Sequence, residues 1–310
     1  MSYPAPAPFT SASVPRSSSH HRGAIAPCRR SSRNSRTSSA QASRIYPRPF
    51  LKWAGGKSRV LPQYLPYFPE YQTYYEPFIG GGAIFFHLGP PQAVLSDINE
   101  ELVNVYQCVQ RHVEDVIELL TLHHDNHCKD YYYRVRSHPG DDPIERAARL
   151  LYLNKTCFNG LYRENSKGYF NVPMGRYKNP TICDPGLLRS ASSALQSVAI
   201  AHEPFEAVLS RAKTTSDFVY FDPPYFPISA TSNFTGYNRY SFTKDDQVRL
   251  RDTFEALAKR GVKVMLSNSD CSFIRELYDG FNIQVIYAAR AINSNAKKRG
   301  KITELLITSY

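Results

Sequence analysis

The tetrapeptide Asp222-Pro223-Pro224-Tyr225 follows the apolar run FVYF, and its residue types could act together on one substrate. A carboxylate and a backbone carbonyl that accept hydrogen bonds from an exocyclic amine would pull its nitrogen toward tetrahedral geometry and free the lone pair. Asp222 supplies the carboxylate, and the two prolines fix the backbone so that a carbonyl points outward. Tyr225 offers a flat face for stacking a base. The motif predicts in-line methyl transfer to a base amine without a covalent enzyme intermediate, although Asp-Pro pairs commonly mark turns.

Three upstream features predict a ligand crevice, and a methyl-sulfonium donor with an adenosine half and a carboxylate is one ligand that would suit it. The turn EPFIGGGAIFF lets the backbone at Gly80 approach a ligand, and its G-x-G-x-x-F spacing differs from that of dinucleotide sites. Asp97 ends the next strand, where it can accept hydrogen bonds from a ribose or an amine. In PFLKWAGGKSR, Trp53 offers an aromatic face and Lys57 a charge for a carboxylate. Singly, these features are more often a turn, an N-cap and core packing.

The elements that must position these residues alternate along the chain. Apolar runs predict strands from Tyr74 and at 93–99, 218–221, 262–268, 281–289 and 302–310. Helical spacing predicts helices from residue 83, at 100–120, at 243–261 with Thr243 as N-cap and Gly261 after its end, and at 271–280. Alternation of this kind is typical of βαβ units in a parallel sheet, whose ligands bind beyond the carboxyl ends of the strands.

The alternation is interrupted between about residues 110 and 200, which are mainly helical and then rich in Gly, Asn and Pro. We therefore expect a catalytic domain at 46–109 and 201–310, with an inserted recognition domain at 110–200. Residues 1–45 contain seven arginines and no acidic residue, and few large apolar side chains, which predicts disorder. A nucleic-acid-tethering arm or a transit peptide has this composition, but a dispensable tail or a misassigned start codon is the simpler interpretation.

Composition narrows the class of protein further. The net charge of +11 suits a polyanionic partner, although the tail carries much of it. The six cysteines form no C-x-x-C pair, and no apolar stretch approaches the roughly 20 residues that span a bilayer. We expect a cytoplasmic protein without a membrane segment. The run HHDNHC at 123–128 lacks a second ligand pair at zinc-finger spacing, so it predicts a polar helix end and no metal site.

From Pro49 to Tyr310 the chain resembles the Dam family of DNA N6-adenine methyltransferases, which act on GATC. The likeness rests on a series of segments in the family's order: FLKWAGGK, EPFIGGGAIFF, LSDIN, LNKTCFNGLYRENSKGYFNVPMGRYKNP, YFDPPY, SATSNFTGYNRYSFT, LSN and SNAKKRGKITELL. The resemblance implies a Rossmann-like α/β methyltransferase sheet with a target-recognition insert, and S-adenosylmethionine as the cofactor. It implies a cofactor site made of Trp53, Lys57, Glu76, Phe78, Gly80, Asp97 and Asp222.

The resemblance also implies how duplex DNA is read after the target adenine is flipped out. Arg163 matches the family's guanine-reading arginine, and Leu161 and Pro173 match its contacts to a thymine methyl. Phe158 stands where the GATC enzymes place a tyrosine that enters the base stack. The remaining implied DNA contacts are Lys52, Asn159 and Arg176. Tyr162 and Glu164 depart from the family pattern.

Other acceptors and classes are less consistent with the sequence. RNA guanine methyltransferases can carry a similar motif but lack the large insert, whereas cytosine-N4 and protein-glutamine enzymes tend to place Ser or Asn at the position of Asp222. Cytosine-C5 transfer needs a Pro-Cys nucleophile, and the only such pair, Pro27-Cys28, lies in the tail. An intact Asp222–Tyr225 motif disfavours an inactive DNA-binding module. We expect a monomer acting on double-stranded DNA; whether it has a restriction endonuclease partner, a prophage role or a housekeeping role stays open.

Overall fold

The computed structural model describes residues 47–228, 242–289 and 301–310 of the chain. The predicted disordered tail at 1–45 lies outside these residues. So do most of the segment SATSNFTGYNRYSFT and the loop NSNAKKRG between the last two strands. Among the described residues, no helix is long and apolar enough to cross a membrane.

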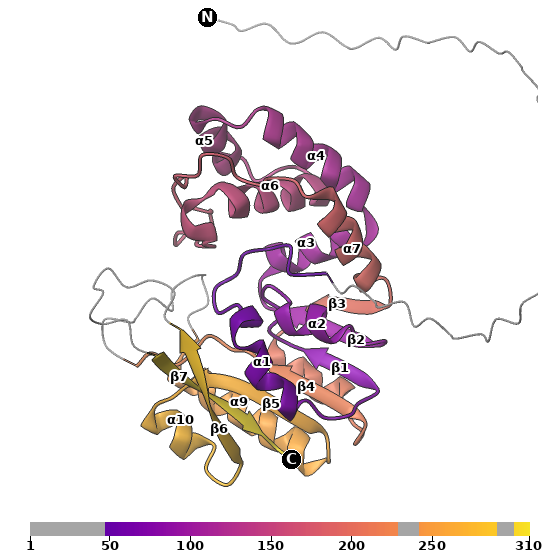
Figure 1. The fold of residues 1–310 in the computed structure, drawn as a ribbon, viewed down its shortest axis with the longest axis vertical. Helices are drawn as coiled ribbons and strands as arrows, with labels where there is room; N and C mark the ends of the chain where they lie inside the picture. The colour runs from indigo at the N-terminus through magenta and orange to yellow at the C-terminus, as the bar shows by residue number, and fades with distance from the viewer. Residues whose placement is uncertain (1–46, 229–241, 290–300) are drawn as a thin grey trace, which may run out of the picture. The chain divides into compact units, whose positions relative to one another are not determined.

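A seven-stranded sheet in the order β3-β2-β1-β4-β5-β7-β6 forms the centre of the fold (Figure 1). The strands are β1 Thr73–Glu76, β2 Ala93–Asp97, β3 Val198–His202, β4 Asp217–Phe221, β5 Lys263–Ser269, β6 Asn282–Ala289 and β7 Lys301–Thr308. The first five are parallel, and β7 runs antiparallel between β5 and β6. The predicted α/β class is therefore correct. β1 pairs with both β2 and β4, so the carboxyl ends of these three strands bring Glu76, Asp97 and Asp222 to one edge of the sheet.

Strand β4 is buried along its whole length because both faces of the sheet are covered. Phe218 and Tyr220 pack into one apolar cluster with Tyr74 and Leu95. The alternate residue Phe221 packs into a second cluster, with Phe254 of α9 and others. This core holds the end of β4, and with it the Asp222–Tyr225 motif, in a fixed position.

The helices lie between the strands and in a group of their own. Their bounds, with 3-10 turns marked η, are η1 Lys57–Arg59, α1 Leu61–Tyr64, η2 Leu65–Tyr67, α2 Ala83–Leu88, α3 Glu100–Arg111, α4 Val113–Asp125, α5 Lys129–Ser137, α6 Pro143–Thr156, η3 Phe158–Gly160, α7 Pro185–Leu195, η4 Phe205–Ala207, α8 Val208–Arg211, α9 Lys244–Lys259 and α10 Ser272–Leu277. Figure 1 shows α4, α5 and α6 grouped together, with α3 and α7 between them and the strands. Helix α9 begins at a Thr243 capping box, as predicted.

Several local predictions need correction. The helix predicted at 100–120 is two helices, because the backbone leaves helical geometry at His112 (φ −134°, ψ 38°). The N-cap of α3 is Asn99, so Asp97 does not have the capping role that an Asp before a helix usually has. Asp-Pro pairs commonly mark turns, but in two other pairs of this chain, Asp142-Pro143 and Asp184-Pro185, the Asp caps a helix whose first residue is the Pro. The run HHDNHC does end α4, as predicted, with the His123 ring stacked on Tyr152.

Residues 157–174 follow α6 and form two antiparallel arms, named here the 157–174 hairpin. Its two arms pair at Cys157 with Met174 and at Glu164 with Phe170. The tip turns at Asn165, whose side chain accepts hydrogen bonds from the backbone N–H groups of Lys167 and Tyr169. The predicted insert boundaries fall inside elements, since α3 crosses residue 110 and β3 crosses residue 200. The division into domains stays a prediction.

Candidate active site

Asp222 is held by two groups that bind the same carboxylate oxygen. Lys57 Nζ lies 2.7 Å from Asp222 Oδ1, and the Ser267 hydroxyl donates to that oxygen at 2.9 Å. Lys57 is 3% exposed and also donates to the Gly55 carbonyl at 2.7 Å, so its position is fixed by the turn that precedes it. Among the described residues, no donor reaches Asp222 Oδ2. Within the described part of the chain, one oxygen of this oriented carboxylate is therefore not engaged by another group.

The backbone after Asp222 is clamped from α9 and β5. The Gln247 amide donates to the Pro224 carbonyl at 3.0 Å, and its own oxygen accepts from Asn268 at 2.9 Å. The oxygen of Asn268 in turn accepts from the Phe226 N–H at 3.1 Å. Within the described chain, the Pro223 carbonyl has no such donor. Of the two carbonyls, that of Pro223 therefore has the greater remaining capacity to accept hydrogen bonds from a ligand.

The Tyr225 ring is fixed at its hydroxyl and at its face. Its hydroxyl donates to Glu304 Oε2 at 3.0 Å, and Tyr64 donates to Glu304 Oε1 at 2.8 Å. Lys57 Nζ lies 4.8 Å from the Tyr225 ring centroid, within cation–π range. Burial, with Tyr64 and Asp222 nearby, raises the pKa of Tyr225 well above its ordinary value, so its hydroxyl remains a donor. The ring is presented rigidly beside Asp222.

A glycine turn between β1 and α2 forms the floor of the predicted cofactor site, named here the cradle (residues 79–82). Gly80 and Gly82 have positive φ angles of 47° and 66°, which side chains other than Gly rarely adopt. A Cβ on Gly80 would lie 3.0 Å from Trp53 Cδ1, so only Gly lets the backbone pass so close to the ring. The Gly80 N–H donates to Asp97 Oδ2 at 3.4 Å, which ties the cradle to the end of β2.

Two carboxyl groups beside the cradle have raised pKa values. Burial raises the pKa of Glu76 to about 8, partly offset by a 2.9 Å hydrogen bond from the Tyr74 hydroxyl. Burial also raises the pKa of Asp97 to about 6, opposed by hydrogen bonds from the backbone of Asn99 and Gly80. Both groups favour a partner that is positively charged or donates hydrogen bonds, because such a partner stabilises the ionised form.

The structure brings most of the predicted cofactor residues together at the ends of β1, β2 and β4. Phe78 differs from the others. Its ring stacks on Phe205 at 5.5 Å and meets Phe221 and Phe242 edge-on, so it packs into the apolar cluster on the α9 side of the sheet. Its predicted contact with a cofactor stays a prediction. The residues that sequence reasoning missed are Tyr64, Gln247, Ser267, Asn268 and Glu304.

Most of the predicted DNA-contacting residues lie in the 157–174 hairpin. Arg176 lies just beyond the hairpin, and Lys52 lies in the segment before η1. Buried Asn154 joins Lys52 to the hairpin: its oxygen accepts from the Lys52 N–H at 2.9 Å, and its NH₂ donates to the carbonyls of Lys52 and Gly160 at 2.7 and 3.2 Å. Phe158 is 50% exposed, at the start of the turn η3, in which Asn159 has a φ of 56°. Half of this large apolar ring is therefore open to a partner.

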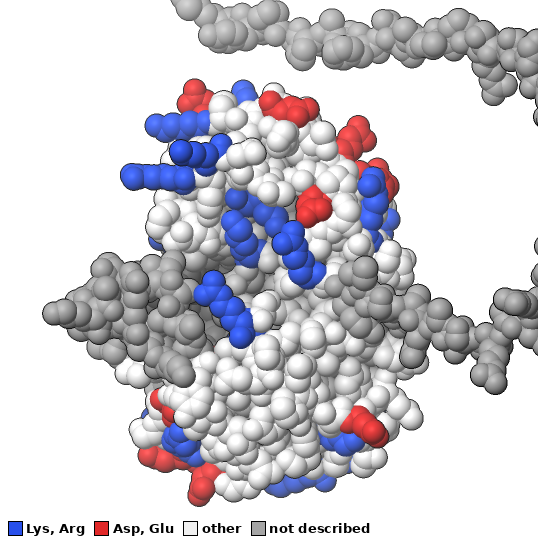
Figure 2. All heavy atoms as spheres, viewed as in Figure 1, with Lys and Arg blue, Asp and Glu red and all other residues white. Residues whose placement is uncertain are grey.

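Arg163 is exposed on the hairpin and already oriented. Its Nε donates to Asn171 Oδ1 on the opposite arm at 2.6 Å. Its Nη2 also donates to the Asn171 carbonyl at 3.5 Å, so the Nε–Nη2 edge of the guanidinium faces the opposite arm, and among the described residues Nη1 has no bond. Figure 2 shows Lys and Arg atoms over the middle of the viewed face, with Asp and Glu atoms mostly nearer its ends. This distribution of charge suits a polyanion.

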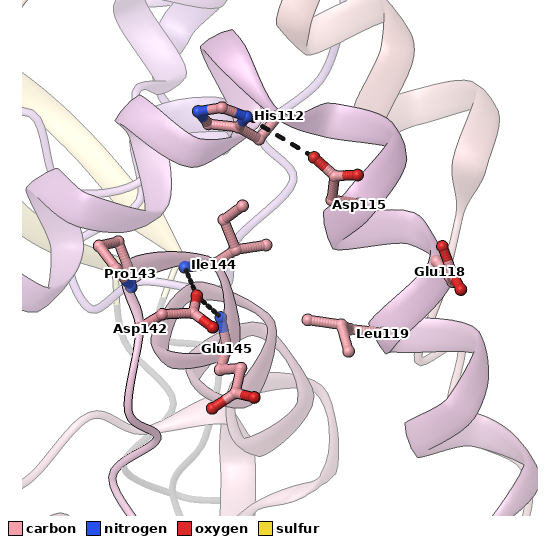
Figure 3. A pocket seen from close by; sticks show the side chains of 8 residues that line it. All are labelled: His112, Asp115, Glu118, Leu119, Asp142, Pro143, Ile144 and Glu145. Carbon is pink, nitrogen blue, oxygen red and sulfur yellow. Dashed lines mark hydrogen bonds and ion pairs between the residues drawn. The ribbon is translucent and has the colours of Figure 1, made fainter. Parts of the chain in front are cut away.

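A separate cavity of about 560 Å³ lies where α3 meets α4, facing the start of α6 (Figure 3). It is lined by His112, Asp115, Glu118, Leu119, Asp142, Pro143, Ile144 and Glu145. None of these residues belongs to the site around Asp222. The Asp142 carboxylate is occupied in capping α6, since it accepts from the N–H groups of Ile144 and Glu145. The acidic lining is also opposite in charge to what DNA requires.

Comparison with known proteins agrees with this geometry. The model of the family described as D12 class N6 adenine-specific DNA methyltransferase matches residues 53–292. The chain is 48% identical over 279 residues to the type II methyltransferase M1.LlaDCHI of Lactococcus lactis subsp. cremoris, covering 87% of this chain and 98% of that protein. It is 45% identical to the type II methyltransferase M.MjaIII of Methanocaldococcus jannaschii, over 85% and 99% of the two chains. It is 37% identical to the DNA adenine methylase of Escherichia coli K12, over 84% and 94%.

Proposed function

Because the chain belongs to the D12 class N6 adenine-specific DNA methyltransferases, we propose that it methylates adenine N6 within GATC in duplex DNA, using S-adenosylmethionine. The observation that carries the proposal is the arrangement at the end of β4. Asp222 has one oxygen bound by Lys57 and Ser267 and the other available. The Pro223 carbonyl and the Tyr225 ring lie on the same short segment. Together they match the two N–H groups and the flat face of an adenine.

The residues around the cradle fit S-adenosylmethionine. When bound, this cofactor supplies a methyl group activated by a sulfonium cation. Glu76 and Asp222 lie close enough that each influences the other's charge, and such a pair of carboxyl groups favours a cation between or beside them. Asp97 offers a half-buried acceptor for hydroxyl or amine hydrogens, and Trp53 an aromatic face over Gly80. We assign these residues to binding the cofactor.

The chain's own groups then prepare the acceptor nitrogen. Asp222 Oδ2 accepts a hydrogen bond from one adenine N–H and the Pro223 carbonyl accepts from the other. This localises the lone pair on N6 and aims it at the cofactor. Tyr225 holds the base by stacking, with its ring kept in place by Glu304 and Lys57. Orientation and preorganised acceptors supply the rate enhancement, and no covalent enzyme intermediate is needed.

Adenine inside a duplex cannot reach this segment, so the proposal includes base flipping, which costs a few kcal/mol. Phe158 is the side chain proposed to occupy the gap, since its ring is half exposed at the start of the hairpin. Arg163 is proposed to read the guanine, with Leu161 and Pro173 against a thymine methyl and Lys52, Asn159 and Arg176 as further contacts. Two relatives are named type II methyltransferases. We extend the proposal to a role beside a restriction endonuclease.

The test uses a duplex with one GATC site and a matched duplex in which the A·T pair after the G of that site is replaced by T·A. Each is incubated with the protein and S-adenosylmethionine, digested to nucleosides and analysed by mass spectrometry. We expect N6-methyladenine from the first duplex only, and protection of the first duplex from an endonuclease that cuts unmethylated GATC. Methylcytosine, or equal methylation of both duplexes, would refute the proposal.

A further inference from the structure

Trp53 lies directly against the cradle. A Cβ atom on Gly80 would come within 3.0 Å of Trp53 Cδ1, and one on Gly81 within 3.4 Å of Trp53 Cβ. These distances leave no room for even a methyl group between the ring and the turn, so the two are closely packed. Gly80 is itself held, since its carbonyl accepts from the Tyr106 hydroxyl at 3.1 Å. A ligand that shifts the cradle therefore shifts Trp53.

Trp53 also contacts the 157–174 hairpin, through Tyr162. The two rings are stacked, with centroids 5.3 Å apart and planes at 29°. Tyr162 is 8% exposed, meets Phe170 of the opposite arm edge-on at 5.9 Å, and donates its hydroxyl hydrogen to Glu164. It is thus fixed within the hairpin at two further points. Tyr162 joins the hairpin to Trp53, and Trp53 joins it to the cradle.

Tyr162 stands between two of the residues proposed to read DNA. Side chains alternate along an extended segment, so Leu161 and Arg163 point away from the side on which Tyr162 is buried. The burial pattern agrees: Tyr162 is buried, Leu161 is half-buried and Arg163 is exposed. The position of the Tyr162 ring therefore sets the height and tilt at which Leu161 and Arg163 meet a base pair.

We propose that Tyr162 is a positioning residue that couples the cradle to the hairpin, so that cofactor and cognate duplex each tighten the binding of the other. This inference rests on the proposed function, because it takes the cradle as the cofactor site and the hairpin as the DNA-reading element. The two effects must be equal, since coupling between binding sites is reciprocal. A stacked aromatic pair sets the expected size of the effect at roughly two- to tenfold.

The chain contains a single tryptophan, so Trp53 fluorescence reports on this contact without a label. The experiment titrates S-adenosylhomocysteine, which has no methyl group to transfer, in the presence and absence of the GATC duplex. For the unaltered protein we expect the Kd to fall about two- to tenfold when the duplex is present. Tyr162→Met, which fills the space without a ring, should bring that ratio to about one while the protein stays folded by its Tm.

Two variants serve as controls. Tyr162→Phe keeps the stacked ring and loses only the hydroxyl, and should keep the ratio of the unaltered protein. Tyr169→Leu removes an exposed aromatic ring from the same hairpin and should keep it as well. An unchanged ratio in Tyr162→Met, or an equal loss in Tyr169→Leu, would overturn the inference. If Tyr162→Met does not fold, the test rests on Tyr162→Phe. A ratio of about one in that variant, which keeps the stacked ring, also overturns the inference that the ring carries the coupling.

Methyl transfer to the same duplex is measured in parallel with the unaltered protein. A protein that methylates adenine but shows a ratio of one refutes the coupling and leaves the proposed function standing. A protein that methylates no adenine refutes the proposed function itself. The two failures are therefore distinguished in one set of samples.

Discussion

The buried Glu76 carboxyl should lower the free energy of unfolding of the unliganded protein as the pH rises. The change Glu76→Gln should remove this loss of stability. The residue is 3% exposed, and burial raises its pKa from 4.5 to about 8. Between these two values the unfolded chain has lost the proton that the folded chain keeps. The folded state then binds more protons, so stability falls with rising pH throughout this window.

The magnitude follows from the size of the shift. One pKa unit corresponds to about 1.4 kcal/mol, so the cost of keeping the buried carboxyl is roughly 3 kcal/mol at pH 7 and about 5 kcal/mol above pH 8. Glutamine has the same shape and can still bond to the Tyr74 hydroxyl, but it never ionises. The variant should match the unaltered protein near pH 4.5 and exceed its Tm by roughly 6–12 °C at pH 7.

Chemical denaturation of the two proteins from pH 5 to pH 8 measures the difference directly. We expect the stability advantage of Glu76→Gln to grow with pH over this range, while methyl transfer is reduced because the acid group is lost from the cofactor site. Glu276→Gln makes the same exchange at an exposed position and controls for the substitution. A difference that is constant with pH, or that shrinks as pH rises, would refute the reasoning.

Three further substitutions test separate parts of the site. Tyr225→Phe and Glu304→Leu should each lower kcat by about tenfold or less, and in a double-mutant cycle the loss in the double mutant should be smaller than the sum of the two, because both changes remove the Tyr225–Glu304 hydrogen bond; fully additive losses would contradict the link. Asn154→Ala should lower the free energy of unfolding by about 3 kcal/mol in chemical denaturation, since it leaves the Lys52 and Gly160 backbone groups without their partner; a decrease under about 1 kcal/mol would contradict this role of Asn154. Arg163→Ala should cost about 1–3 kcal/mol in kcat/KM on GATC and relax selectivity at one base pair, whereas equal losses across a panel of altered sites would indicate a phosphate contact.

The parts of the site that sequence reasoning found have short-range signals. Asp222, Glu76 and Asp97 each end an apolar strand, and Lys57 follows a pair of glycines. Parallel strands place their carboxyl ends on one edge of a sheet, so the strand pattern predicts that such acidic residues share that edge, whereas the contact of Lys57 with Asp222 is visible only in the structure.

The supporting groups have no such signal. Glu304 reaches Tyr225 only because β7 enters the sheet antiparallel between β5 and β6, a pairing that local patterns do not specify. Gln247 and Ser267 act through bonds to residues more than 20 positions away. At His112 the local pattern is misleading: the helical apolar spacing continues from Val109 to Val116, so it predicts one helix where the structure has two. The short strand β3 was absorbed into the predicted insert.

The central claim is that the Asp222 carboxylate prepares the adenine nitrogen for methyl transfer, beyond any part it has in binding the cofactor. Asp222→Asn keeps the size of the side chain and one oxygen for Ser267 and Lys57, but the group that faces the adenine N–H becomes an NH₂, which cannot accept a hydrogen bond. The decisive measurement is single-turnover methyl transfer to a GATC duplex with both ligands saturating, alongside their Kd values and with Asp279→Asn as an exposed control. We predict a rate roughly 100- to 1,000-fold lower with both Kd values within about threefold of the unaltered protein. A rate within tenfold, or a loss explained by weaker binding, would contradict the role of Asp222.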